Sequence, residues 1–174
     1  MSNAANLGLL ALRVAVGGTM IAHGYNHVWG GGKIPGTGRW FASLGMRPGV
    51  LHAWLASLTE LGAGALLVLG LLHPFAAGAC AGVMVVALVI NHWKNGFFIF
   101  RPGEGYEYVL NLAVASLALA AIGPGEWSLD RALGIDDSLG GWTGAVIGAV
   151  IGIGGALALL AAFWRPERED AAAG

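Results

Sequence analysis

The stretch LGLLALRVAVGGTMIAHGYNHVW, at residues 7–29, decides the fold class of the chain. About 20 apolar residues, each rising about 1.5 Å along a helix, cross the hydrocarbon core of a bilayer, so this stretch is long enough to span a membrane. Three ionisable residues, Arg13, His23 and His27, interrupt it. Because a charged group at mid-membrane is costly, we expect this helix to turn them toward partner helices.

The composition supports an integral membrane protein. Charged residues make up 11% of the 174 positions, against about a quarter in soluble domains, and hydrophobic residues make up 56%. The net charge of −1 and the lack of a Lys/Arg block give no reason to expect nucleic acid as a partner. Cys80 is the only cysteine, which excludes an intrachain disulfide and a CxxC pair, and we expect it to be a small buried apolar residue.

Four further apolar stretches, at about residues 50–72, 75–93, 106–122 and 142–164, predict four more spans. The expected fold is an all-α transmembrane bundle with a four-helix core at residues 1–134. Residues 135–174 would add a fifth helix and a polar tail. We expect the first span to be retained, because residues 1–6 carry no Lys or Arg and the apolar run exceeds that of a signal peptide. In the glycine-rich loop at residues 30–49, residues 39–44 predict a short interfacial helix.

Glycines mark the faces on which two of these helices pack. Gly78 and Gly82 are four apart in the third span, and Gly144, Gly148 and Gly152 repeat the same interval in the fifth. Small residues at this spacing let helix backbones approach closely in membranes. The fifth helix is therefore expected to pack tightly, either within this chain or against a second copy in a homo-oligomer.

Basic residues predict the orientation. Seven Lys or Arg residues lie on one side of the membrane, in the loop between the first and second spans, the loop between the third and fourth spans, and the tail. The other side has only Arg131. The positive-inside rule then places the N-terminus outside and the C-terminus in the cytoplasm, in a bacterial inner membrane.

Ionisable groups from four spans are expected in the same half of the bilayer. Glu60 is about 15 Å deep in the second span, and the others lie toward the cytoplasmic side. Those others are His23, His27, His92 and Glu107. A membrane-buried Glu60 must be protonated, paired or in a polar cavity, which makes this convergence the most informative feature of the sequence.

Each group also has a purely structural interpretation. His27 and His92 would simply reach the interface, and His23 would be a hydrogen-bonded packing residue. Glu107 would favour the positive end of its helix. An ion pair between Arg13 and Glu60 would be structural only. A metal site is not expected, because the HxxxH spacing of His23 and His27 is a weak signal without ligand distances.

An ordered series of residues resembles the DoxX family of small bacterial membrane proteins. The series extends over about residues 7–134 and comprises Arg13, His23-Gly24, Glu60-Leu61-Gly62-Ala63-Gly64, Gly96-Phe97-Phe98, Gly105-Tyr106-Glu107-Tyr108, Gly123-Pro124-Gly125 and Ser128-Leu129-Asp130. The resemblance implies a four-helix bundle and an association with redox chemistry. Some members resemble subunits of a thiosulfate:quinone oxidoreductase, and mycobacterial relatives are linked to a membrane complex with superoxide dismutase. The fifth span departs from the family pattern.

Three functions are compatible with these observations. In a quinone-linked oxidoreductase subunit, His23 would bind a quinone carbonyl and Glu60 or Glu107 would relay protons. His27, Tyr106 and His92 would complete the quinone site. The chain has no flavin or nucleotide motif, so electrons would come from a partner or directly from substrate. A membrane scaffold that recruits soluble redox enzymes through its cytoplasmic loops is the second hypothesis, and a small proton-coupled transporter is the third.

Overall fold

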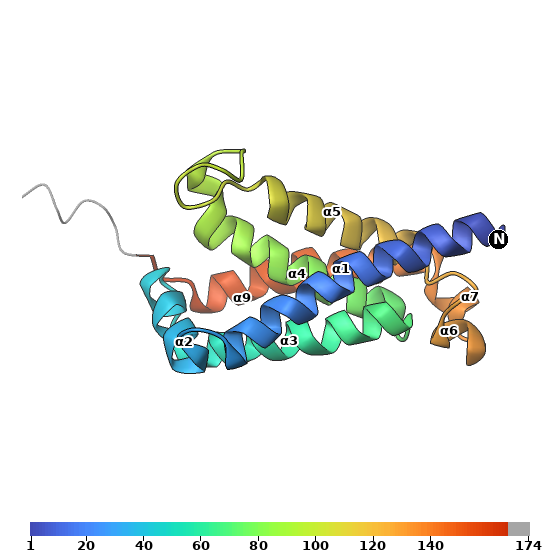
Figure 1. The fold of residues 1–174 in the computed structure, drawn as a ribbon, viewed down its shortest axis with the longest axis horizontal. Coiled ribbons are helices and arrows are strands. Elements are labelled where there is room, and N and C mark those ends of the chain that lie inside the picture. The colour runs from blue at the N-terminus through green and yellow to red at the C-terminus, as the bar shows by residue number, and fades with distance from the viewer. Residues whose placement is uncertain (167–174) are drawn as a thin grey trace, which may run out of the picture.

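The computed structural model describes residues 1–166, which form a bundle of long helices (Figure 1). The helices that cross the bundle are α1 (Asn3–Trp29), α3 (Gly49–Leu69), α4 (His73–Ala87) and α5 (Glu107–Ile122), together with α8 (Gly141–Ala149) and α9 (Gly155–Phe163). Two π-helical turns, η1 (Leu88–His92) and η3 (Val150–Gly154), extend α4 and join α8 to α9. The 3₁₀ turn η2 (Trp93–Asn95) follows η1, and the short helices are α2 (Lys33–Ser43), α6 (Leu129–Ala132) and α7 (Asp136–Leu139).

The all-α membrane fold expected from the sequence is confirmed. Four helical segments are long and apolar enough to cross a bilayer, at residues 3–29, 49–69, 73–95 and 141–163. The remaining long helix, α5, has 16 residues and a length of about 24 Å, which is short for a span. Helix α3 ends earlier than predicted because Gly70 adopts a left-handed conformation at φ +66° and closes the helix. Helix α2 begins at Lys33, so it is longer than the helix expected at residues 39–44.

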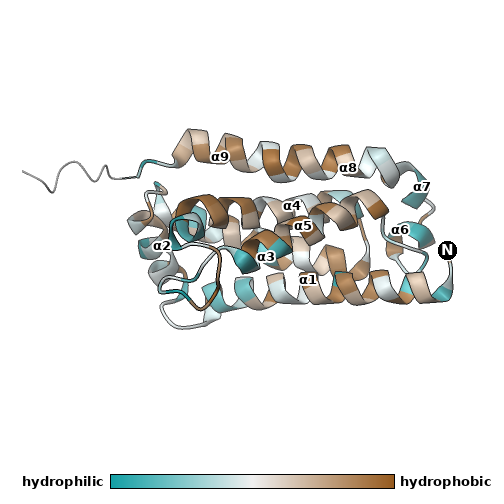
Figure 2. Ribbon diagram, turned by 90° about the horizontal axis from the view of Figure 1, so that it is seen from above, coloured by the Kyte–Doolittle hydropathy of each residue, from teal (hydrophilic) through white to brown (hydrophobic). Residues whose placement is uncertain are grey.

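The fifth span packs against α4 and α5 of the same chain. Figure 2 shows α8 and α9 as a separate layer on one side of these helices, opposite α1. A Cβ added at Gly148 would lie 2.6 Å from that of Ala120, and one added at Gly152 would lie 3.0 Å from that of Ala81. The glycine stripe therefore has an intramolecular partner. On the facing helix, a Cβ at Gly78 would lie 3.1 Å from Gly148 Cα and one at Gly82 would lie 3.3 Å from Gly152 O. Gly144 lies directly against the backbone of Ala120.

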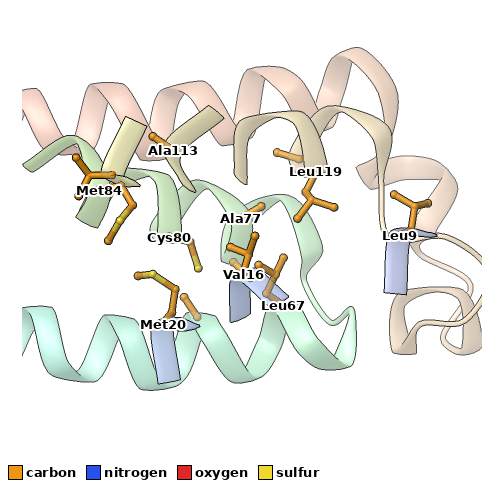
Figure 3. Close-up of a cluster of buried hydrophobic side chains, with 13 residues drawn as sticks. Leu9, Val16, Met20, Leu67, Ala77, Cys80, Met84, Ala113 and Leu119 are labelled. Carbon is orange, nitrogen blue, oxygen red and sulfur yellow. The ribbon is translucent and has the colours of Figure 1, made fainter. Parts of the chain in front are cut away.

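A small apolar core fills the centre of the bundle (Figure 3). Met20 of α1, Leu67 of α3, Cys80 of α4 and Leu119 of α5 belong to this cluster, and each is at most 1% exposed. The thiol of Cys80 is free and buried, as expected for a packing residue. This core joins the first four spans into one body.

The loops with most basic residues lie at one end of the bundle. Figure 1 shows α2 and the segment after η2 at one end, whereas the N-terminus, α6 and α7 lie at the other. The C-terminal end of α9 is tied to the α2 end, since Trp164 Nε1 donates to Leu44 O at 2.9 Å. Arg165 N donates to Gly45 O at 2.8 Å. Arg168, which the orientation argument also counted, lies outside the described residues.

Candidate functional site

A cavity of about 430 Å³ lies toward the α2 end of the bundle. This volume is within the range of small-molecule sites. Its walls come from α1, α2, α3, α4 with η1, α5 and the segment formed by η3 and α9, and most of the lining is aliphatic or aromatic. The polar groups among the lining residues are His23, His27, His52, Thr59, Glu60, Asn91, His92, Glu104 and Tyr108. The cavity is thus an apolar space with a few polar groups in its wall.

Glu60 and His27 form a buried contact between two ionisable side chains in the cavity wall. Glu60 Oε2 lies 2.9 Å from His27 Nδ1, and the side chains are 4% and 18% exposed. Neither atom meets the geometry of a hydrogen bond, so the two groups approach closely without good alignment. The contact therefore brings a carboxyl group and an imidazole together in the wall of the cavity.

His23 lies one turn before His27 on α1 and contacts a different helix. Its Nε2 is 3.0 Å from the hydroxyl of Tyr108 on α5, and the two rings stack with centroids 6.0 Å apart. A tyrosine hydroxyl can donate to a neutral imidazole or accept from it. Sequence reasoning quoted Tyr108 only as part of a motif and gave it no role, although it follows the proposed acid Glu107 by one residue.

His92 is held in a defined orientation at the end of η1. Its Nδ1 lies 2.9 Å from Glu104 O, and because a backbone carbonyl only accepts, Nδ1 carries the hydrogen. Its Nε2 is then an acceptor and lies 3.3 Å from the side-chain amide of Asn91. The π turn that carries both residues faces the cavity, and such turns are frequent at functional sites.

His52 was missed by the sequence analysis. It lies in the first turn of α3, is 2% exposed and lines the cavity. Its ring packs edge-on against Phe163, with centroids 5.1 Å apart, so the end of the fifth span helps to hold it. A lone histidine near a helix end has no sequence signal that separates it from an interfacial one.

Two of the predicted site residues do not line the cavity. Glu107 Oε2 accepts a hydrogen bond from Ile99 N at 3.3 Å, and Tyr106 stacks on Trp93 with centroids 5.1 Å apart. The structure therefore does not bring these two residues to the other polar groups, although Tyr106 packs against the apolar core of the bundle. Helix α5 begins only at Glu107, so its first turn faces the loop that folds back from η2.

The predicted ion pair between Arg13 and Glu60 does not form. Arg13 donates to Pro124 O at 2.7 Å and to Trp127 O at 2.6 Å, at the opposite end of the bundle. Glu60 instead lies level with Gly24, where an added Cβ would be 3.0 Å from that of Glu60. Eleven residues of α1 separate Arg13 from that level, which is about 16 Å along the helix and beyond the reach of an arginine side chain.

Among residues 1–166, no three His, Cys, Asp or Glu side chains are grouped closely enough to hold a metal ion. The polar groups of the cavity instead suit a ligand with hydrogen-bonding oxygens on an apolar body. Comparison with protein-family models gives one match, to DoxX over residues 8–93. This segment ends before α5, whereas the sequence resemblance extended to residue 134. Comparisons with curated proteins and with solved structures gave no match.

Proposed function

Since the chain belongs to the DoxX family of multi-pass membrane proteins, we propose that it binds a quinone as a subunit of a membrane oxidoreductase. The observation that supports this proposal best is the apolar cavity with the His27–Glu60 contact in its wall. A quinone has an apolar ring and tail and two carbonyl oxygens, which is the ligand chemistry that such a space accommodates.

Access from the bilayer is consistent with the cavity wall. Leu55 of α3 lines the cavity and is 41% exposed. Gly155 of the fifth span is also exposed and lines the cavity. A membrane-dissolved quinone would therefore enter sideways between α3 and the fifth span, without crossing water.

Each polar group would have a separate part in the reaction. Reduction of a quinone to a quinol takes up two electrons and two protons, and the protons go to the two ring oxygens. His23, already bonded to Tyr108, would hold one carbonyl. Glu60 would receive protons through His27, which is the more exposed member of the pair. The electrons would come from a partner protein or directly from a substrate, since the sequence has no motif for a flavin or nucleotide.

The test is quinone retention and binding by protein reconstituted in nanodiscs. Wild-type protein should co-purify with quinone, detected by extraction and mass spectrometry, and His23→Ala should lose roughly tenfold in affinity for an added short-chain quinone. Glu107→Gln is the matched control for Glu60→Gln, because Glu107 lies outside the cavity. In a working complex, Glu60→Gln should slow quinone-coupled turnover and Glu107→Gln should not. Wild-type protein that binds no quinone would refute the proposal.

A membrane scaffold is the second candidate function. It is favoured by the α2 end of the bundle, where Phe100 is 80% exposed and basic loop residues gather. These loops would recruit soluble redox proteins. Replacing residues 95–101 with a polar loop of equal length should abolish co-purification of such partners while leaving quinone binding intact. If partner recovery is unchanged, this surface does not recruit them.

We also propose that the α2 end faces the cytoplasm of a bacterial inner membrane, from the excess of basic residues at that end. Cysteines introduced at Lys33 and at Ser138 in a Cys80→Ala background should report opposite sides. An impermeant maleimide added to intact cells should label the cysteine at position 138 and spare the one at position 33. The reverse labelling would overturn this orientation.

A further inference from the structure

His52 carries an unsatisfied polar atom at the cavity wall. The residue is 2% exposed, and within residues 1–166 its Nε2 has no hydrogen-bond partner. Buried polar atoms are almost always paired, because an unmade hydrogen bond costs the desolvation of the group. Since His52 lines the cavity, a ligand in that cavity is the natural source of the missing partner.

The other ring nitrogen fixes the chemistry of Nε2. His52 is hydrogen-bonded to the backbone of Arg47. The Arg47 amide already donates to Phe163 O at 3.2 Å, so the contact with His52 uses the Arg47 carbonyl. A carbonyl only accepts, which puts a hydrogen on Nδ1, and in the neutral form of the imidazole Nε2 then carries a lone pair. Nε2 is therefore suited to accept a hydrogen bond from a hydroxyl group.

The spacing along α3 sets the size of a ligand that reaches both polar groups of this helix. His52 and Glu60 are eight residues apart, which is about 12 Å along the helix axis. A ligand that contacts both side chains therefore needs polar atoms several ångströms apart, with a hydrogen bond of about 2.8 Å at each end. A six-membered ring with oxygens at opposite positions spans a length of this order.

From these contacts we infer that His52 binds the hydroxyl of a reduced quinone, at the end of the ring opposite Glu60, and so favours the quinol over the quinone. A quinol presents an O–H that Nε2 accepts, whereas a quinone presents a carbonyl that has no hydrogen to give. His23 and the His27–Glu60 contact then serve one oxygen, and His52 serves the other. This inference rests on the proposed function, and it adds a binding residue and a preference for one redox form.

The experiment compares the affinities of both redox forms in the same protein. Short-chain ubiquinone and its quinol are titrated anaerobically into nanodisc-embedded protein, and binding is followed by calorimetry. His52→Phe keeps an aromatic ring against Phe163 but cannot accept a hydrogen bond. It should raise the Kd of the quinol roughly threefold to tenfold and change that of the quinone less than about twofold. His52→Gln, which retains an acceptor, should recover part of the quinol affinity.

The outcomes separate this inference from the proposed function. Equal weakening of both forms in His52→Phe would show that His52 only shapes the cavity, and unchanged binding of both forms would show that it touches no ligand. Either result overturns the inference and leaves quinone binding in place. Wild-type protein that binds neither form would overturn both. A matching thermal stability of His52→Phe and wild type, measured in the same nanodiscs, ensures that a selective loss reflects binding.

Discussion

Replacing Arg13 should be among the most destabilising single changes in the bundle. Its guanidinium is 1% exposed and donates to two carbonyls of the loop that follows α5, at Pro124 and Trp127. Hydrogen bonds from a charged donor are each worth about 1.5–3 kcal/mol, and their loss leaves both carbonyls without partners. We expect Arg13→Met to lower the free energy of unfolding by about 3–5 kcal/mol.

The measurement is equilibrium unfolding in mixed detergent micelles, followed by far-UV circular dichroism. Arg131→Met is the control, because Arg131 is exposed and surface ion pairs such as the one it makes with Asp136 at 3.1 Å contribute little to stability. Helix content before unfolding should be the same in all three proteins. If Arg13→Met is as stable as wild type, the loop carbonyls do not depend on this guanidinium and the reasoning fails.

A double-mutant cycle separates the observed contacts of Arg13 from the pair expected from the sequence. Arg13 and Glu60 lie at different levels of the bundle, so Arg13→Met and Glu60→Gln should add within about 0.5 kcal/mol. A coupling energy well above 1 kcal/mol would indicate that the two side chains interact directly. That result would restore the ion pair predicted from the sequence.

Two further predictions concern packing and capping. Gly152→Val should lower the unfolding temperature in detergent, because an added Cβ meets Ala81 and loosens the packing of the fifth span. Gly154→Val is the control and should leave the unfolding temperature nearly unchanged, because the space around its added Cβ is open. Asp130→Ala should cost about 1–2 kcal/mol of unfolding free energy, because the buried carboxylate accepts from the amides of Leu72 and His73 at 2.8 and 2.9 Å. The exposed Asp137→Ala serves as its control, and equal losses in the two variants would exclude a capping role.

The lengths of the apolar runs predicted most of the fold. The runs located the spans within a few residues, since a bilayer demands helices and a fixed minimum length. Glycines at intervals of four located the contact between the third and fifth crossing segments, at Gly78 and Gly148, because close backbone approach needs small residues. Sequence could not tell that this contact is intramolecular, because the same stripe would serve a second copy equally well.

Pairing between helices depends on axial register, which the sequence does not contain. Arg13 and Glu60 are the charged residues within the first two spans, so an ion pair between them was the simplest hypothesis. Their levels in the bundle are set by the packing of Gly17 against Gly64, which places Arg13 beside the loop after α5. That loop supplies backbone carbonyls, and backbone groups have no signature in a sequence. Asp130 was missed as a buried cap for the same reason.

The site combines residues from the segment that matches the family model with residues from the rest of the chain. Two of its ionisable members, His27 and Glu60, lie in the segment that matches the family model, and sequence reasoning found both. Tyr108 and the apolar wall at Ile151 and Leu159 lie beyond that segment. The fifth span, expected to be an addition to the core, closes the cavity and packs against His52 through Phe163. The residues proposed to transfer protons thus lie in the segment that matches the family model. The rest of the chain forms much of the apolar wall and so determines which ligand shapes fit the cavity.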